Sequence, residues 1–474
     1  MKIIKYLILC LTMGIHMSCK VPMTVESPAI KSIPKQYADV LDTTDIGNIQ
    51  WRNYFSDPYL VDLIDTAIQN NPELYITLQD IEIARNKIMM KDGQLLPLVS
   101  VGGGLGLEKV GRYTSSGAGD ASTEITPGKK VPDNLTDINM GLAASWEADI
   151  WGKLHNAKKT AFTEYLASKE GENFVLTNLV SEIANNYYEL LALDNELEII
   201  RQSIRLQQNQ LEIVKVQKQA SVVSELAVKQ FEAQLLSSQG LEYETLQKIT
   251  ETENNVNFLL GRYPVRIQRN PASLDSLFPP QVQSGIPSQL LRNRPDIRQA
   301  ELELTAAKLD IKTAQLEFLP SLGIGGRLGL QSFSPAYIYK IPESLLYSLV
   351  GDLTGPIVNR KVLMAEFKNA NARQIQALYN YQKTILNGFR EVSNEFSNID
   401  NLSKMYSLKF TESEVQNQSI DIANDLFKSA RANYLEVLTA QREALETKLE
   451  LVEIKKVQLN NVVGLYRALG GGWK

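Results

Sequence analysis

Four segments of the chain alternate between apolar residues and small or polar residues with a period of two. The longest begins at Ile138 and places Ile, Met, Leu, Ala and Trp on one parity, while Asn, Gly, Ala, Ser, Glu and Asp occupy the other. Such alternation predicts β-strands that have one apolar face. The strands are expected at about residues 97–110, 137–150, 320–331 and 345–357.

Long helices are predicted after each pair of strands. Residues 153–219 contain no proline and only one glycine, Gly171, and a helix of this length would approach about 100 Å. Apolar residues recur in it at steps of three, four and seven, which is typical of a coiled-coil seam. The seam residues are Leu193, Leu197, Ile200, Ile204, Leu211 and Val214. Further helices are expected at about residues 225–260, 287–317, 361–430 and 435–469.

The sequence contains an internal repeat. The segment that starts at Asn71 aligns without gaps with the segment that starts at Arg294, at a constant offset of 223 residues. Leu96-Pro97 matches Leu319-Pro320, and the glycine-rich strand starts also match. A tandem duplication of units of about 200 residues is therefore predicted. The expected division is a signal at 1–18, an N-terminal segment at 19–54, and repeats at 55–275 and 276–474.

The N-terminus predicts export and lipidation. Two lysines precede an apolar run at residues 6–15, which is the layout of a secretory signal and too short to span a bilayer. Ser18 and Cys19 follow, and a small residue before such a cysteine resembles a bacterial lipoprotein processing site. Cys19 would then be the lipidated first residue of the mature chain. The alternative is an ordinary signal with an incidental cysteine, because His16 stands where leucine is usual.

The composition argues against several classes of function. Lys and Arg total 49 and Asp and Glu total 54, which gives a formal net charge of −5 without the basic patch that nucleic acid requires. The only cysteines are Cys10 and Cys19, and the only histidines are His16 and His155. We therefore expect no zinc site, no other metal, no cofactor and no catalytic residue. The sequence also lacks a phosphate-binding glycine loop with a following lysine and a nucleophile elbow.

The predicted strands suit a transmembrane barrel. Strands of this length, with one apolar face and one glycine-rich face, can place lipid outside and water inside. The alternative is a half-buried sheet of a soluble protein. Trp146 and Trp151 end the second strand, where an interfacial aromatic girdle would lie, although either could pack in a core instead.

Four strands cannot close a barrel, because the smallest known barrels use about eight and open edges are not tolerated in lipid. The chains must therefore assemble. Two copies would give eight strands and a lumen filled by side chains, whereas three would give twelve strands and an aqueous lumen. The Gly, Ser and Ala residues at inward positions favour the open lumen.

The motifs together resemble one known family. They are NNPEL and RNRPDIRQAE, the pair LPLVSVGGGLGL and LPSLGIGGRLGL, WEADIWGKL, LTGPIVN and LYRALGGGW. This combination resembles the TolC-like outer-membrane efflux protein family, and most closely its lipoprotein branch that serves resistance-nodulation-division pumps. The resemblance covers nearly everything after about Trp51.

The resemblance implies a mixed α/β membrane protein that works as a homotrimer. Its four strands per chain would form a twelve-stranded outer-membrane barrel, continued by a long α-helical periplasmic barrel with coiled-coil packing. It would dock on a periplasmic adaptor protein and an inner-membrane transporter, and would passively conduct drugs or other toxic compounds out of the cell. Type I protein secretion and metal efflux remain alternatives, and a periplasmic coiled-coil scaffold is a third.

The resemblance also implies a gate where the long helices turn at the periplasmic tip. The matching turns are Ala220–Ser224 and Ala430–Tyr434, in which the two alanines replace the usual glycines. The family's two acidic gate positions fall at Glu436 and Thr439, and Thr439 carries no charge. A ring of three Glu436 carboxylates would attract cations. The alternative is that Glu436 is an ordinary first-turn glutamate that the helix dipole favours.

Overall fold

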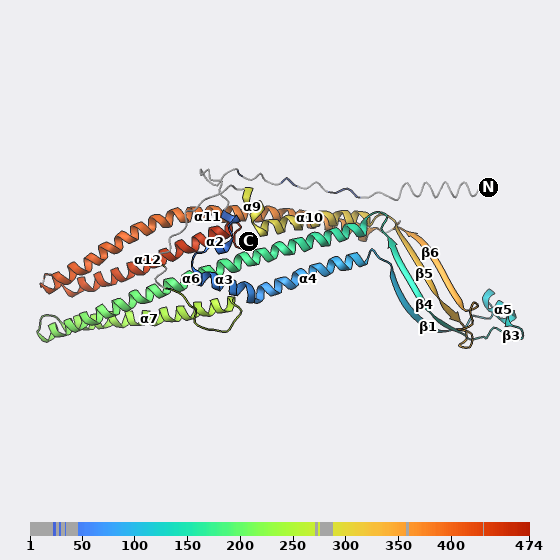
Figure 1. Ribbon diagram of the computed structural model, residues 1–474, viewed down its shortest axis with the longest axis horizontal. Coiled ribbons are helices and arrows are strands. Elements are labelled where there is room, and N and C mark those ends of the chain that lie inside the picture. The colour runs from blue at the N-terminus through green and yellow to red at the C-terminus, as the bar shows by residue number, and fades with distance from the viewer. Residues whose placement is uncertain are drawn as a thin grey trace. The chain divides into compact units, whose positions relative to one another are not determined.

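The computed structural model describes residues 22–24, 28–29, 34, 46–270, 274, 288–356, 360–429 and 431–474. The chain forms two compact units, and both halves of the sequence contribute to each of them. The sheet unit contains Ile83–Tyr165 and Leu302–Leu378. The helical unit contains Ala29–Glu82, Leu166–Glu301 and Tyr379–Lys474 (Figure 1). A spatial unit is therefore not a sequence repeat.

The centre of the sheet unit is an antiparallel four-stranded sheet with the order β1-β4-β5-β6 (Figure 1). Its strands are β1 (Leu98–Glu108), β4 (Leu135–Ala148), β5 (Ser321–Ser332) and β6 (Leu345–Thr354). The connection between β1 and β4 carries its own structure: α5 (Ser115–Ser122), β2 (Glu124–Thr126) and β3 (Lys129–Lys130). The alternating pattern of the sequence is realised as strands over all four predicted segments.

Two facing glycines allow β4 and β5 to approach closely. Gly141 pairs with Gly329, and a Cβ on Gly329 would lie 2.3 Å from the carbonyl oxygen of Met140. A Cβ on Gly141 would lie 2.5 Å from the carbonyl oxygen of Leu328. These distances are far below van der Waals contact, so the pairing of β4 with β5 at Gly141 and Gly329 requires glycine on both strands.

Long helices dominate the rest of the chain. They are α6 (Lys153–Gln219), α7 (Glu225–Leu259), α11 (Lys361–Lys428) and α12 (Tyr434–Ala468). The shorter helices are η1 (Ile46–Asn48), α2 (Trp51–Tyr54), α3 (Pro58–Asn70), α4 (Pro72–Gly93), α9 (Ser288–Asn293) and α10 (Pro295–Leu316). No helix among the described residues combines the length and apolarity needed to cross a membrane.

One helix of the sequence prediction is wrong as a single element. The helix expected at 287–317 is divided into α9 and α10, and Arg294 lies between them. Pro295 is the cause, because its ring disfavours helical backbone at the preceding residue while its own φ suits the first position of the next helix.

The core of the helical unit is built on α6. The six seam residues predicted from the sequence are buried, and Ile200 and Val214 are completely so. Near the middle of α6, Tyr187 donates a 2.7 Å hydrogen bond to Asp57, which also caps the N-terminus of α3. Tyr54 stacks on Tyr466 of α12 with ring centroids 3.9 Å apart. These contacts tie residues 46–57 to the long helices.

Candidate functional site

The register of the sheet separates two chemically different faces. Directly opposed residues lie on the same face of an antiparallel pair, and one parity collects almost all the large apolar side chains. Val101 and Leu349 on this apolar face are 82% and 83% exposed. The apolar face consists of Val99, Val101, Leu105 and Leu107 of β1; Ile138, Met140, Leu142, Ala144 and Trp146 of β4; Leu322, Ile324, Leu328 and Leu330 of β5; and Leu345, Tyr347, Leu349 and Leu353 of β6.

The opposite face, called the polar face, carries mostly small and polar residues, and Leu98, Leu346 and Val350 are among its large apolar members. Gln331 donates a 2.8 Å hydrogen bond to Asp137 across β5 and β4. A Cβ on Gly323 would lie 2.6 Å from a carboxylate oxygen of Asp352, so glycine leaves room for this acid. The polar face includes Ser100, Gly102, Gly104 and Gly106 of β1; Asp137, Asn139, Gly141, Ala143, Ser145 and Glu147 of β4; Gly323, Gly325, Arg327, Gly329 and Gln331 of β5; and Ser348 and Asp352 of β6.

An exposed apolar face of this extent needs a partner. Monomeric soluble proteins rarely expose contiguous apolar patches larger than a few hundred Å², whereas this one continues across all four strands. Strands of 10 to 14 residues also match the length that spans a bilayer at a tilt. The sheet can therefore separate lipid on one side from water on the other.

The sheet has two open edges. β1 pairs only with β4 and β6 pairs only with β5 among the described strands. An open edge presents a row of unpaired N–H and C=O groups that another strand can satisfy. In a hydrocarbon environment such groups must be paired.

The two predicted interface tryptophans lie where strands meet helices. The indole of Trp146 donates a 2.9 Å hydrogen bond to the carbonyl of Leu95, just before β1. The indole of Trp151 donates a 2.7 Å hydrogen bond to the carbonyl of Pro320, just before β5. Both side chains stay partly exposed. An amphipathic ring with its N–H satisfied suits a boundary between lipid and water.

Asp149 is a positioning residue that the sequence analysis missed. Its carboxylate accepts hydrogen bonds from the backbone N–H groups of Leu154 and His155, at 3.0 and 2.9 Å. It thereby caps α6, and these bonds with the His155 side chain lower the pKa of the Asp149 carboxyl against the effect of burial. An aspartate shortly before a helix start is a readable capping signal.

The first predicted tip turn joins α6 to α7. α6 ends just before Ala220, and Ser221 adopts a left-handed backbone with φ 59°. Ser224 is the N-cap of α7 and its hydroxyl accepts a hydrogen bond from the N–H of Ala227. The left-handed backbone position, at which glycine would be favoured, is therefore Ser221, one residue after Ala220.

The second predicted tip turn joins α11 to α12. Tyr434 is the first residue of α12, so it belongs to the helix. Asn433 and Glu436 form a capping box: Asn433 accepts from the N–H of Glu436, and Glu436 accepts from the N–H of Asn433. Glu436 and Thr439 line a shared groove with Glu443. Ala430 and Cys19 lie outside the described residues.

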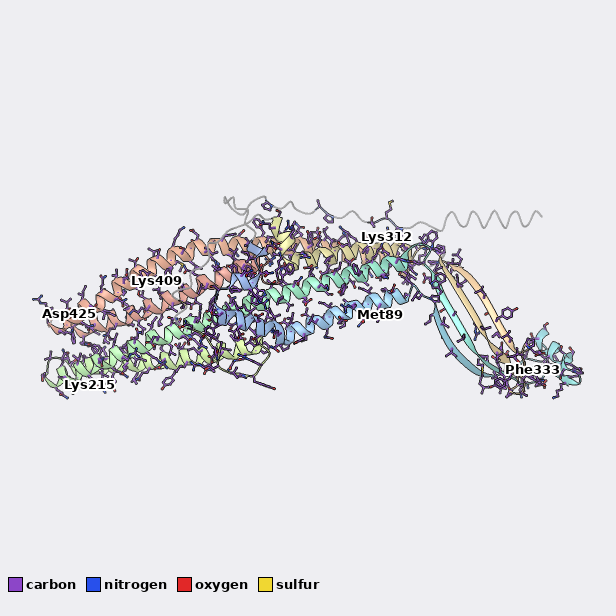
Figure 2. All side chains as sticks on the ribbon, viewed as in Figure 1. Met89, Lys215, Lys312, Phe333, Lys409 and Asp425 are labelled. Atoms are coloured by element: carbon purple, nitrogen blue, oxygen red, sulfur yellow. The ribbon has the colours of Figure 1, made fainter. Side chains whose placement is uncertain are left out.

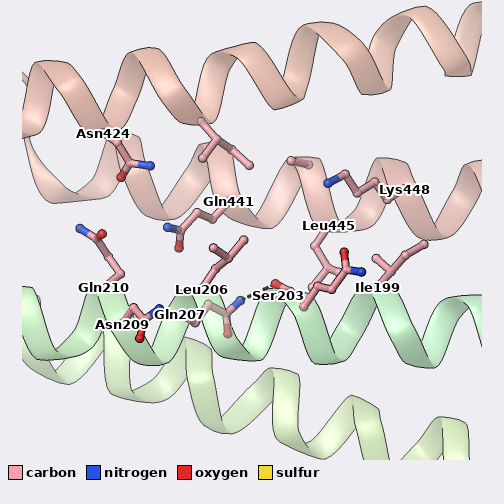
Figure 3. Close-up of a pocket in the computed structure, with 13 residues that line it drawn as sticks. Ile199, Ser203, Leu206, Gln207, Asn209, Gln210, Asn424, Gln441, Leu445 and Lys448 are labelled. Carbon is pink, nitrogen blue, oxygen red and sulfur yellow. Dashed lines mark hydrogen bonds between the residues drawn. The ribbon is translucent and has the colours of Figure 1, made fainter.

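A cavity of about 190 Å³ with both amide and aliphatic side chains in its lining lies between α6 and the α11/α12 hairpin (Figure 3). Gln207 is only 2% exposed and donates to Ser203. Within the described part of the chain, the side-chain carbonyl oxygens of Gln207, Asn424 and Gln441 have no hydrogen-bond donor. Buried carbonyls beside a cavity of this size are usually satisfied by water. These buried amides thus lie directly beside the apolar cluster of Ile200, Ile204 and Leu445, because Leu445 also lines the cavity.

The described residues contain no group of three or more His, Cys, Asp or Glu side chains arranged to hold a metal ion. Many charged residues of the helices form ion pairs with one another. Lys409 of α11, which Figure 2 labels, forms an ion pair with Glu450 of α12, with 2.7 Å between the Lys409 ammonium nitrogen and a carboxylate oxygen.

The chain is similar over its whole length to outer-membrane efflux proteins. It is 28% identical to the pyoverdine export outer membrane protein OpmQ of Pseudomonas aeruginosa, over 100% of this chain and 98% of that protein. It is 26% identical to the cation efflux system protein CusC of Escherichia coli, over 99% of each.

Solved structures agree with the sequence relationships. A crystal structure of CusC aligns with a TM-score of 0.81 and 25% identity, over 96% of this chain and 100% of that chain. The open state of the MtrE outer membrane channel of Neisseria gonorrhoeae aligns with a TM-score of 0.81 and 22% identity, over 96% and 99%. The sequence profile for "outer membrane efflux protein" matches residues 63–262 and 286–471. The chain therefore belongs to the outer membrane efflux protein family.

Proposed function

We propose that three copies of this chain form a passive exit duct of a tripartite efflux system in the outer membrane. Each copy contributes four strands to a twelve-stranded barrel, and the long helices form a periplasmic barrel below it. A periplasmic adaptor protein and an inner-membrane transporter deliver the cargo and supply the energy.

The observation that carries this proposal is the open sheet with one exposed apolar face. β1 and β6 are unpaired edges, and lipid does not tolerate unpaired backbone groups. Closure by three copies gives twelve strands, and the glycines of the polar face leave the lumen open. In a cyclic trimer the contact is head to tail, so β6 of one copy pairs with β1 of the next.

We also propose that the fold arose by duplication of one unit. The gapless match at an offset of 223 residues supports this. The residues just before α4 and α10, Asn71 and Arg294, are at matching positions, and both bond to the end of a long helix. The hairpins α6/α7 and α11/α12 then correspond to each other.

The N-terminus and the aromatic residues complete the membrane attachment. Cys19 is proposed to carry lipid, and a relative, SilC of Salmonella typhimurium, is named a probable outer membrane lipoprotein. Lipid adds attachment to a barrel that already holds the chain in the bilayer. Trp146 and Trp151 are proposed to lie at the membrane interface, on the side of the helices.

Toxic small molecules such as drugs are the proposed cargo. Relatives include toluene and solvent efflux proteins of Pseudomonas putida and the cation efflux protein CusC. Metal cations are the second candidate, because CusC covers nearly the whole chain. A wide duct needs no complementary binding pocket, which allows related channels to serve different pumps.

Reconstitution tests the proposal. Protein extracted from outer membranes should require detergent, and should give stepwise conductance when added to a planar lipid bilayer, whereas detergent alone gives none. Release by salt without detergent, with no conductance, would instead identify a periplasmic coiled-coil scaffold. Co-purification from intact membranes then identifies the adaptor and the transporter.

A further inference from the structure

We propose that Arg327 forms a ring of positive charge inside the barrel, which contacts anionic groups of solutes as they pass. The inference rests on the proposed trimeric duct and adds a specificity-determining residue to it. The ligand class is a carboxylate, phosphate or sulfonate group carried by a solute in transit.

Arg327 lies near the middle of a strand, on the polar face. β5 runs from Ser321 to Ser332, so Arg327 is several residues from either end. Its register partners are Ala143 on β4 and Ser348 on β6. The alternation along β5 places Arg327 on the side of the sheet opposite to the leucines of the apolar face.

Every close neighbour of Arg327 on this face is small or neutral. Gly325 and Gly329 precede and follow it along the strand, and Ala143 and Ser348 lie across from it. Arg327 is exposed and makes no hydrogen bond or ion pair with the residues that the structure describes. Leu346 and Val350, the partners of Gly329 and Gly325 on β6, are the diagonal neighbours and are apolar. The Arg327 guanidinium therefore has no charged neighbour beside it on this face and is open to the medium that fills this side of the sheet.

The acidic residues of the polar face are found toward the strand ends. Asp352 and Glu147 are the register partners of Gly323, and Glu147 forms an ion pair with Lys153. Asp137 accepts a hydrogen bond from Gln331. Both Gly323 and Gln331 are four residues from Arg327, or about 13 Å along the strand. This separation exceeds the Debye length of about 8 Å at physiological ionic strength. The arginine charge is therefore not neutralised by its own sheet.

The position also requires water. An arginine near the bilayer midplane is strongly unfavourable on the lipid face of a barrel, whereas a lumen substitution changes selectivity. Arg327 can therefore lie at the midpoint of a membrane strand only if the polar face lines an aqueous lumen.

The charge occurs in only one half of the sequence. The aligned position in the first strand, at the offset of 223 residues, is Gly104. A trimer would therefore carry three arginines at one level, separated by strands that present Ala143, Ser100 and Ser348 there. Guanidinium groups bind carboxylate and phosphate through two parallel hydrogen bonds, so this level favours anions and opposes multivalent cations.

Ion selectivity in planar bilayers tests the ring. Arg327→Gln removes one cation from each chain and so three from the trimer. It should raise the potassium-to-chloride permeability ratio at least about two- to fivefold, the effect of a single nearby charge in a water-like medium. Arg327→Lys should keep the wild-type ratio. Lys340→Gln is the matched control, because it removes one cation from the loop after β5 and should leave the ratio unchanged.

Thiol labelling tests the position independently. In Arg327→Cys, a charged water-soluble thiol reagent should change the conductance of open channels. In Leu328→Cys, on the apolar face, the same reagent should have no effect and a lipid-soluble maleimide should react. An unchanged permeability ratio in conducting Arg327→Gln trimers, or an unreactive Arg327→Cys, would overturn the ring. Absence of conductance in the wild type would overturn the duct itself.

Discussion

Asn71 and Arg294 hold matching positions in the two halves of the chain, and each donates a hydrogen bond to the last carbonyl of a long helix. The Asn71 amide reaches Leu259 of α7 at 2.8 Å, and the Arg294 guanidinium reaches Ala468 of α12 at 2.9 Å. The last four carbonyls of a helix lack partners inside it. Different side chains thus perform the same task in both halves.

Glycines beyond the helix ends make the same contact possible. Gly261 and Gly470 have φ of +63° and +89°, which favours glycine. A Cβ on Gly261 would lie 2.3 Å from the carbonyl oxygen of Asn70, and one on Gly470 would lie 2.5 Å from the carbonyl carbon of Asn293. The motifs NNPEL and RNRPD therefore form docking points for the ends of α7 and α12.

Loss of the buried arginine should destabilise the fold. Arg294 has a side chain that is 5% exposed and bonds to Asp296 and Glu391, each at 2.7 Å. Arg294→Leu would leave both carboxylates without their cation, which costs about 3–5 kcal/mol. Thermal unfolding in detergent, monitored by circular dichroism, should show a clearly lower melting temperature than that of the wild type. Arg373→Leu, which breaks an exposed pair with Glu366, should cost about 0–1 kcal/mol. Equal effects of the two variants would contradict the docking role.

Glu196 should make stability depend on pH. Burial raises the pKa of its carboxyl from 4.5 to about 7; Glu453 and Glu189 add to the shift, and Lys456 and Lys248 oppose it. The folded state then binds more protons than the unfolded state between about pH 4.5 and 7, so stability is greatest below this window and falls as pH rises through it. Glu196→Gln should gain stability relative to the wild type as pH rises through the window.

Glu198→Gln is the control for this pH effect. Hydrogen bonds from Gln202 and Arg205 lower the pKa of the exposed Glu198 carboxyl. Stability from this group is present above its ordinary pKa and lost as pH falls, so the control variant should show no gain at high pH. If the difference in stability between Glu196→Gln and the wild type were the same at every pH, the raised pKa of Glu196 would be disproved.

The two faces of the sheet could be predicted from the sequence, because successive residues of a strand point to opposite faces and the apolar residues therefore share one of them. The strand from Leu135 to Ala148 follows the predicted alternation and stops where Asp149 begins to cap α6. The seam of α6 was likewise predicted by its spacing and is buried.

Other features depend on contacts that no local pattern encodes. Two spatial units that combine both halves of the chain arise from long-range packing. α5, with Thr114 as its N-cap, lies between two predicted strands, in a segment without a periodic apolar pattern. The cavity around Gln207 and Gln441 arises because residues on different hairpins meet.

The capping box of Asn433 and Glu436, by contrast, could be predicted from the sequence, since Asn followed by Glu three residues later is its signature.

The gate hypothesis predicts a change in selectivity without a change in assembly. Glu436→Gln removes one carboxylate per chain, but glutamine can still accept the bond from Asn433, so the capping box survives. Planar-bilayer recordings should show a lower potassium-to-chloride permeability ratio, whereas Arg327→Gln should raise this ratio. Glu225→Gln, in the first turn of α7, should leave selectivity unchanged. An unaltered ratio in assembled Glu436→Gln trimers would make Glu436 a helix cap only.

Lipidation predicts a specific change at the N-terminus. Cys19→Ala should abolish incorporation of labelled acyl chains, while the barrel still holds the protein in the membrane. Mass spectrometry of the mature wild-type N-terminus should find Cys19 with an acyl mass. A different first residue, or an unmodified Cys19, would rule out this attachment.

Native mass spectrometry of the detergent-solubilised protein, combined with circular dichroism of the same sample, tests assembly most directly. The account predicts a single species with three times the mass of the mature chain and with intact β-structure, because the edges of β1 and β6 must pair between copies. A stable monomer that retains its β-structure would contradict the shared barrel.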